Sequence, residues 1–234
     1  MHIDATPAQP VLAGIGTEAT PTLKSIDFWF DPISPYASLA FERLPVALAG
    51  LSYCVNYRPV LLAGLLREWG QKGPAETPPK RAWIYRQVAW AAHRDGVELQ
   101  LPALHPFNPL ALLRLMLACG PADSLPNRRV CEAVLRHVWR GGADPADAQR
   151  LQALTAALMP KRDPSGDEVK AELRAATQQA LALGVFGVPT LVVDGRLFWG
   201  LDSLEMVAAC LRGDAWFDGP GWLAAAAARP GPMR

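Results

Sequence analysis

The sequence predicts an α/β fold in which one small mixed sheet is interrupted by a large all-helical insertion. A strand, a helix and a second strand fit residues 25–57, and a short hairpin followed by a helix fits residues 189–211. Between them, about 120 residues show helical periodicity and helix breaks, with no convincing strand. We therefore expect the two ends to form one sheet, with the first strand in its centre and the hairpin antiparallel beside it.

The first half has the pattern of a βαβ unit. Residues 25–28 alternate between polar and apolar side chains, and residues 28–30 are all aromatic, which is typical of a central strand. Pro35 favours the first turn of a helix, and that helix is expected to end near Gly50. Residues 51–57 form the next strand, and the crossover between the two strands should be right-handed.

The middle of the chain is expected to consist of helices. Gly120-Pro121 is one of several breaks in the apolar periodicity. Asn108-Pro109 looks like a helix cap followed by a first-turn proline. The expected helices cover residues 61–69, 79–94, 108–119, 124–140, 145–156 and 166–183.

Strands return late in the chain. Residues 189–193 and 196–199 flank Asp194-Gly195, the strongest two-residue hairpin signal in the sequence. A last helix is expected over residues 203–211.

These elements divide the chain into four parts. Residues 25–60 and 184–212 together form the sheet-bearing domain, and residues 61–183 form the helical insertion domain. Residues 1–24 are expected to be a disordered leader, and residues 213–234 a partly ordered C-terminal tail.

Charge and hydropathy exclude two classes of partner. The chain has 23 Lys and Arg residues and 22 Asp and Glu residues, so its net charge does not attract nucleic acid or an anionic membrane. No apolar stretch approaches the ~20 residues that span a bilayer. Residues 1–24 lack the basic start and apolar middle of a signal peptide. We therefore expect neither nucleic acid nor membrane as a partner.

The four cysteines point to a reducing compartment. Cys54, Cys119, Cys131 and Cys210 form no Cys-x-x-Cys or zinc pattern. Each lies in an apolar setting, so buried structural thiols are expected. This usage fits the cytoplasm.

Residues 31–37, Asp-Pro-Ile-Ser-Pro-Tyr-Ala, follow directly on the first strand. They resemble the active-site turn of thioredoxin-type, DsbA-like proteins, with Ser34 and Ala37 in place of the two cysteines. A helix N-terminus favours an anion, and a hydroxyl there can donate a hydrogen bond to a thiolate. The missing thiol suggests a ligand that brings its own, and glutathione is the obvious candidate. The alternative is that Ser34 only caps the helix.

A second part of the site is expected at Val188-Pro189. Proline cannot donate to a ladder, so Pro189 belongs at the first position of its strand. In thioredoxin folds, which this layout resembles, the equivalent proline is cis and faces the active-site turn. The residue before it then offers its N–H and C=O to a peptide-like ligand. An ordinary trans proline is the alternative.

A third part is expected at Asp202-Ser203, at the start of the last helix. This is first of all a capping pair. The carboxylate could also accept the ammonium group of a ligand such as the γ-glutamyl end of glutathione, and both roles are compatible.

Together these motifs resemble the 2-hydroxychromene-2-carboxylate isomerases, which are grouped with the kappa-class glutathione transferases in the DsbA-like superfamily. The similarity spans roughly residues 26–212 and implies a thioredoxin-like fold with a large helical insertion. The motifs that carry it are residues 31–36, 186–190 and 199–202.

The resemblance also implies roles for single residues. Ser34 would be the catalytic residue and hold the glutathione thiolate, while Val188 would pair with the cysteinyl backbone beside Pro189. Asp202 and Ser203 would bind the γ-glutamyl group. The resemblance further implies a lysine near the glycyl end of glutathione and an asparagine in the site, which are Lys80 and Asn108 in this chain.

The implied function is a glutathione-dependent isomerisation in aromatic-compound catabolism: thiolate addition, ring opening, bond rotation and elimination. The partners would be a small aromatic substrate and, as in the family, a second copy in a homodimer. A kappa-like transferase that conjugates electrophiles is the alternative, and a non-catalytic, DsbA-like peptide-binding protein is a further one. A dithiol oxidoreductase is nearly excluded, because no cysteine occupies either active-site position.

Overall fold

The computed structural model describes residues 23–227, and its sheet has four strands in the order β2-β1-β3-β4. β1 (Lys24–Phe30) pairs in parallel with β2 (Tyr53–Pro59) and antiparallel with β3 (Thr190–Val193). β4 (Arg196–Trp199) pairs antiparallel with β3 at the edge. The expected mixed sheet, with the first strand inside it, is confirmed.

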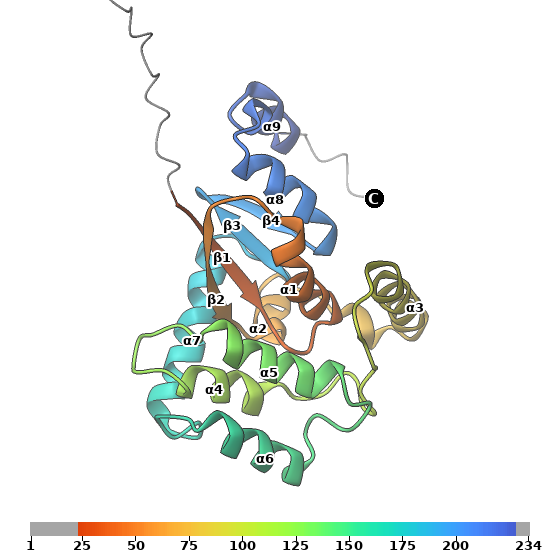
Figure 1. Ribbon diagram of the computed structural model, residues 1–234, viewed down its shortest axis with the longest axis vertical. Coiled ribbons are helices and arrows are strands. Elements are labelled where there is room, and N and C mark those ends of the chain that lie inside the picture. The colour runs from red at the N-terminus through yellow and green to blue at the C-terminus, as the bar shows by residue number, and fades with distance from the viewer. Residues whose placement is uncertain (1–22, 228–234) are drawn as a thin grey trace, which may run out of the picture.

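The helices surround this sheet. Figure 1 shows α4, α5 and α6 at one end of the molecule and α8 and α9 at the other, with the sheet between them. The α-helices of the described chain are α1 (Pro35–Ala47), α2 (Leu62–Glu68), α3 (Pro78–Asp95), α4 (Leu110–Ala118), α5 (Arg128–Trp139), α6 (Ala148–Leu158), α7 (Asp167–Ala182), α8 (Leu204–Leu211) and α9 (Pro220–Ala226).

The hairpin between β3 and β4 has the geometry that its dipeptide predicts. Asp194 and Gly195 have φ angles of 48° and 77°, as the two central residues of a type I′ turn require. The Asp194 carboxylate also accepts a hydrogen bond from Nζ of Lys24 at 2.8 Å. This contact ties the tip of the hairpin to the start of β1.

Two helices begin later than the sequence predicts. α5 begins after Asn127, whose Oδ1 accepts the N–H of Val130 at 3.0 Å. α6 begins after Asp147, whose Oδ1 accepts the N–H of Arg150 at 2.9 Å. In both cases a capping side chain sets the first helical residue, and the residues before it remain in the loop.

The two faces of β1 contribute to two different parts of the core. Phe28 and its alternate neighbours join a large buried cluster with α1, α4, α5, α7 and α8. Trp29 faces the other way, onto a smaller cluster that includes Leu65 of α2 and Ala180 of α7. The larger cluster therefore contains side chains of both the sheet and the helical insertion.

The cysteines differ from the expectation of four buried thiols. Cys131 is buried, and burial raises the pKa of its thiol. Cys119 and Cys210 are only partly buried, and Cys54 is exposed. The expectation is wrong for Cys54 because β2 is an edge strand and alternation places this side chain on its outward face. All four cysteines are free thiols.

The C-terminal tail is ordered as far as it is described. Phe217 and Trp222 pack against Phe198 of the edge strand β4, and Asp218 pairs with Arg196. The leader expected over residues 1–24 lies almost entirely outside the described residues.

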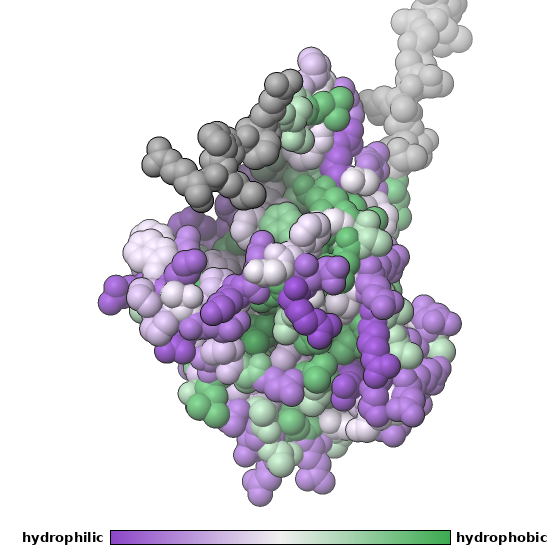
Figure 2. Space-filling model, turned by 180° about the vertical axis from the view of Figure 1, so that it is seen from behind, coloured by the Kyte–Doolittle hydropathy of each residue, from purple (hydrophilic) through white to green (hydrophobic). Residues whose placement is uncertain are grey.

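Two further observations concern hydrophobic residues. No helix within residues 23–227 is long and apolar enough to cross a membrane. On the face shown in Figure 2, hydrophobic residues reach the surface in the middle of the molecule, and hydrophilic side chains surround them.

Candidate active site

The turn from β1 into α1 is held from within by a buried carboxylate. The N–H of Ser34 donates to the carbonyl of Asp31 at 3.0 Å, which closes the turn. The two carboxylate oxygens of Asp31 accept the N–H groups of Ile33 at 3.0 Å and Leu62 at 2.9 Å. Complete burial raises the pKa of Asp31 to about 7, although these two hydrogen bonds favour the charged form.

Ser34 stands at the N-cap of α1, as expected. Its Oγ accepts the N–H of Ala37 at 3.3 Å and donates to the carbonyl of Val188 at 3.4 Å. Both distances are long for hydrogen bonds of these types. The cap and the contact to Val188 therefore occur together, and two segments far apart in the sequence meet at this hydroxyl.

The Val188–Pro189 peptide bond is cis, as expected. The Pro189 carbonyl accepts the N–H of Gly200 at 2.9 Å, so it is already paired. Within residues 23–227, neither a backbone nor a side-chain group accepts a hydrogen bond from the N–H of Val188. Val188 thus keeps a free donor beside the carbonyl that contacts Ser34.

Trp199, which lines the same cavity, packs closely against this loop. A Cβ added to Gly187 would lie only 2.7 Å from Nε1 of Trp199. The ring of Trp199 also packs on Phe186, with centroids 5.0 Å apart. Position 187 therefore has no room for a side chain unless Trp199 moves.

A cavity of about 1060 Å³ opens beside Val188 and Pro189. Its walls come from α1, α3, the loop before β3, the turn from β4 to α8, and α8 along its length. Tyr36 and Gln87 form part of the wall, and the Tyr36 hydroxyl donates to Oε1 of Gln87 at 2.6 Å. The charged side chains of the lining are Arg43, Arg94, Asp202, Glu205 and Arg212.

Asp202 and Ser203 lie in a short 3-10 helix (Leu201–Ser203) at the cavity, but they differ in exposure. Asp202 is exposed and forms no ion pair with another described residue. Ser203 is buried, and its Oγ donates to the carbonyl of Gly200 at 2.8 Å. The expected side-chain cap of α8 is not formed, because the 3-10 turn keeps the Ser203 hydroxyl on Gly200.

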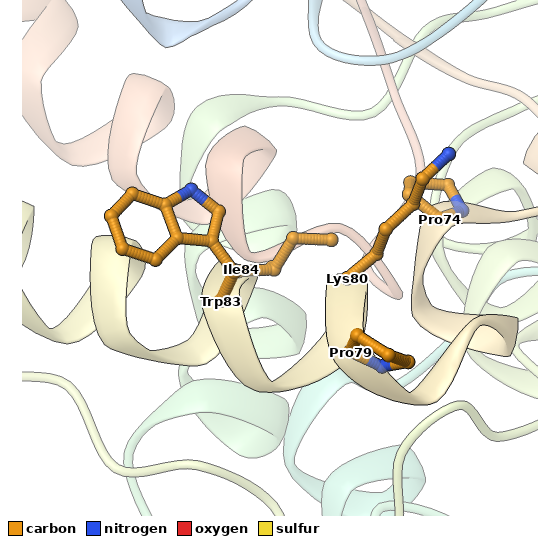
Figure 3. A pocket seen from close by; sticks show the side chains of 5 residues that line it. All are labelled: Pro74, Pro79, Lys80, Trp83 and Ile84. Carbon is orange, nitrogen blue, oxygen red and sulfur yellow. The ribbon is translucent and has the colours of Figure 1, made fainter.

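Lys80 and Asn108 are not part of the cavity. Lys80 is exposed and lines a separate depression of about 420 Å³ at the start of α3. Figure 3 shows it beside Pro74, with Trp83 on the next turn of the helix. Asn108 is exposed, and its Oδ1 accepts the N–H of Leu110 at 3.1 Å. Asn108 is therefore a turn residue just before α4 and not its N-cap as expected, because the helix begins one residue later than the motif predicts and Pro109 occupies the N-cap position.

The sequence did not reveal two contacts to the active-site turn. Nε1 of Trp139 donates to the carbonyl of Pro32 at 2.8 Å, and Nε2 of His105 lies 2.8 Å from the carbonyl of Ile33. Both side chains come from the helical insertion. An isolated histidine and a tryptophan on a helical face gave no signal of this, because the contacts depend on tertiary packing.

The site contains no metal cluster. Within residues 23–227, no group of three or more His, Cys, Asp or Glu side chains could hold a metal ion.

Comparisons with known proteins agree with this geometry. The family model of the DSBA-like thioredoxin domain matches residues 25–212. A 2-hydroxychromene-2-carboxylate isomerase from Sphingobium xenophagum is 31% identical, covering 80% of this chain and 98% of the relative. Glutathione S-transferase kappa 1 from Rattus norvegicus is 27% identical, covering 84% and 94%.

A solved structure shows the same fold. A 2-hydroxychromene-2-carboxylate isomerase superposes with a TM-score of 0.69 at 21% identity, covering 88% of this chain and 100% of that chain.

Proposed function

Because this chain belongs to the 2-hydroxychromene-2-carboxylate isomerase family of DSBA-like thioredoxin-domain proteins, we propose that it is a glutathione-dependent isomerase of this type. The observation that carries the proposal is the meeting of Ser34 and Val188 at the N-terminus of α1. Neither position 34 nor position 37 is a cysteine, so the reactive thiol must come from a ligand.

The residues at the cavity fit glutathione. The free N–H of Val188 suits the backbone of a peptide-like ligand, and the unpaired carboxylate of Asp202 suits an ammonium group. Arg94 and Arg212 line the same cavity and suit the carboxylates of the tripeptide. The cavity volume, about 1060 Å³, leaves room for a second small molecule.

Each residue has a defined task in this proposal. Glutathione supplies a thiolate that adds to the conjugated ring of the substrate and is eliminated after ring opening and bond rotation. The Ser34 hydroxyl donates a hydrogen bond to the sulfur and so favours the thiolate, together with the positive end of α1. Asp202 orients the ligand by its ammonium group, and Ser203 holds the turn that presents Asp202.

The Ser34 hydroxyl connects thiolate binding to backbone pairing. It has one proton, which it shares with the Val188 carbonyl across a long contact of 3.4 Å. When the hydroxyl donates to a thiolate instead, the Val188 carbonyl no longer accepts from Ser34 and is open to an amide N–H of the ligand. Val188 then offers both its N–H and its C=O, which is the pairing that an extended peptide uses.

Lys80 and Asn108 remain weaker parts of the proposal. Both lie outside the cavity of Val188 and Asp202. Contact of Lys80 with the glycyl end of glutathione would require the ligand to extend to the start of α3.

The test is the ultraviolet absorbance of the glutathione thiolate across a pH series, with wild type, Ser34→Ala and Ser124→Ala. Ser124 lies in the loop between α4 and α5, away from the cavity, and serves as the matched control. We expect wild type and the control to lower the thiol pKa of bound glutathione. Ser34→Ala should reduce the thiolate fraction about tenfold, as loss of one hydrogen bond to a charge implies. An unshifted thiol pKa with wild type would refute the mechanism.

A kappa-type transferase is the second candidate, supported by the 27% identity with the rat kappa enzyme over 94% of its length. It would use the same glutathione site but consume the thiol. Free thiol measured during turnover separates the two, because only a transferase depletes it.

The remaining expectations belong to the same proposal. The second substrate would be a small aromatic compound of a catabolic pathway, acted on in the cytoplasm. The protein would form a homodimer, which sedimentation velocity of the full chain would detect.

A further inference from the structure

The active-site turn accepts hydrogen bonds from two sets of residues: some lie within the turn, and others belong to the helical insertion. Asp31 supplies the contacts within the turn through its carboxylate and its carbonyl. On the side of the insertion, the carbonyls of Pro32 and Ile33 meet Trp139 of α5 and His105 of the loop before α4.

His105 acts on the peptide unit that carries Ser34. That unit joins the Ile33 carbonyl to the Ser34 N–H, and the N–H already donates to Asp31 at 3.0 Å. The other end of the unit, the Ile33 carbonyl oxygen, lies 2.8 Å from Nε2 of His105. With both ends bonded, this peptide plane is restrained, and so is the Cα from which the Ser34 side chain projects.

The protonation of the ring is set by its neighbours. A carbonyl oxygen only accepts, so Nε2 must carry the hydrogen that bonds Ile33. Nδ1 lies 2.9 Å from the Tyr85 hydroxyl, whose one proton can be donated to it or to the His105 carbonyl at 3.2 Å. Burial lowers the pKa of His105 most, the hydrogen bond to Ile33 partly offsets this, and Arg81 lowers the pKa further, so the net shift favours the neutral ring with its hydrogen on Nε2.

Aromatic rings fix the orientation of His105. Its ring lies 5.5 Å from that of Trp139, 5.6 Å from Tyr85 and 6.2 Å from Phe107, between centroids. All three rings come from the helical insertion. The imidazole therefore cannot turn away from Ile33 without displacing its neighbours.

We propose that His105, oriented by Tyr85, is a positioning residue: it aims the Ser34 hydroxyl at the bound thiolate by fixing the Ile33–Ser34 peptide. This inference rests on the proposed function of Ser34. It assigns to the insertion a part in thiolate stabilisation that acts through Ser34.

The chain offers a matched control in His137. This histidine is also partly buried, and its Nε2 lies 3.0 Å from a backbone carbonyl, that of Pro145. It stands at the end of α5, where it contacts the loop before α6 and not the active-site turn. His137→Asn therefore loses a similar hydrogen bond without touching the site.

The experiment compares His105→Asn, His105→Gln and His137→Asn with wild type by thiolate absorbance and steady-state kinetics. Asparagine is too short to reach Ile33, whereas the glutamine amide can occupy the Nε2 position. For His105→Asn we expect the thiolate fraction and kcat to fall about fivefold, the effect of one neutral hydrogen bond. KM for glutathione should stay within about twofold, since Val188 and Asp202 are unchanged. His105→Gln should restore wild-type values, and His137→Asn should match wild type.

A second measurement without glutathione separates this inference from the proposed function. Hydrogen exchange at the Ser34 amide, followed by NMR, should be faster in His105→Asn than in wild type or His137→Asn. Equal exchange in all three proteins, or an equal loss of thiolate in the two asparagine variants, would overturn the positioning role. Failure of wild type to lower the thiol pKa would instead overturn the proposed function, while the exchange result would still decide the role of His105.

Discussion

Replacing Asp31 with asparagine tests how the buried carboxylate supports the active-site turn. Its pKa is raised from the model-compound value of 3.8 to about 7, chiefly by burial. The folded protein therefore keeps the proton at a pH where the unfolded chain has lost it. Stability contributed by this group is fully present below pH 3.8 and is lost as the pH rises through about 7.

The magnitude follows from linkage. Three pH units of difference correspond to about 4 kcal/mol in total, and about 2.5 kcal/mol of this is lost between about pH 5 and pH 8. His105 and His137 have pKa values lowered from 6.5, so their contributions to stability change in the opposite direction, as the pH falls below about 6.5 in the lower part of this window. The difference between wild type and Asp31→Asn cancels these contributions.

The assay is urea unfolding of wild type and Asp31→Asn at several pH values. The variant is also destabilised by an amount that does not depend on pH. The single amide oxygen of asparagine can replace only one of the two carboxylate oxygens that accept the N–H groups of Ile33 and Leu62. We expect the stability advantage of wild type to shrink by about 2.5 kcal/mol between about pH 5 and pH 8. A constant difference across this range would refute the reasoning, and an NMR titration of the Asp31 carboxyl carbon would check the pKa directly.

Two further predictions concern packing. Phe217→Ala should lower the free energy of unfolding by about 3–5 kcal/mol in urea titrations, since this ring is buried against Phe198. Leu223→Ala, at an exposed position of α9, should change it by less than about 0.5 kcal/mol, and similar losses in both variants would show that the tail does not pack on β4. Gly187→Ala should displace Trp199, lower the free energy of unfolding by about 1–3 kcal/mol and raise KM for glutathione about tenfold, as measured by urea titrations and initial rates. An unchanged KM would contradict the close packing of Trp199 beside Val188.

Much of the fold follows from short-range patterns. The hairpin at Asp194-Gly195, the helix that begins behind Ser34 and the strand opened by Pro189 each depend on residues within a few positions of one another. The helix starts were less accurate, because several prolines and polar residues compete as caps and only one of them forms the hydrogen bond. Asn127 is such a case.

The site was predicted in part. Ser34 and Val188 are in contact, and Asp202 lies on the same cavity, as the three motifs imply. Ser203 turns inward to Gly200, and Lys80 lies in a separate depression. A motif specifies which residues are near each other in the chain, but not which way a side chain points once the elements pack.

By itself, the sequence determined the βαβ and ββα halves, the cysteine-free turn and the family. These depend on local geometry and on the absence of a thiol at positions 34 and 37. Only the tertiary structure decided that the helical insertion also holds this turn, through His105 and Trp139. The reason is physical: carbonyls of a turn find donors wherever the chain brings them, and residues 70 to 110 positions away leave no periodic signal in the sequence.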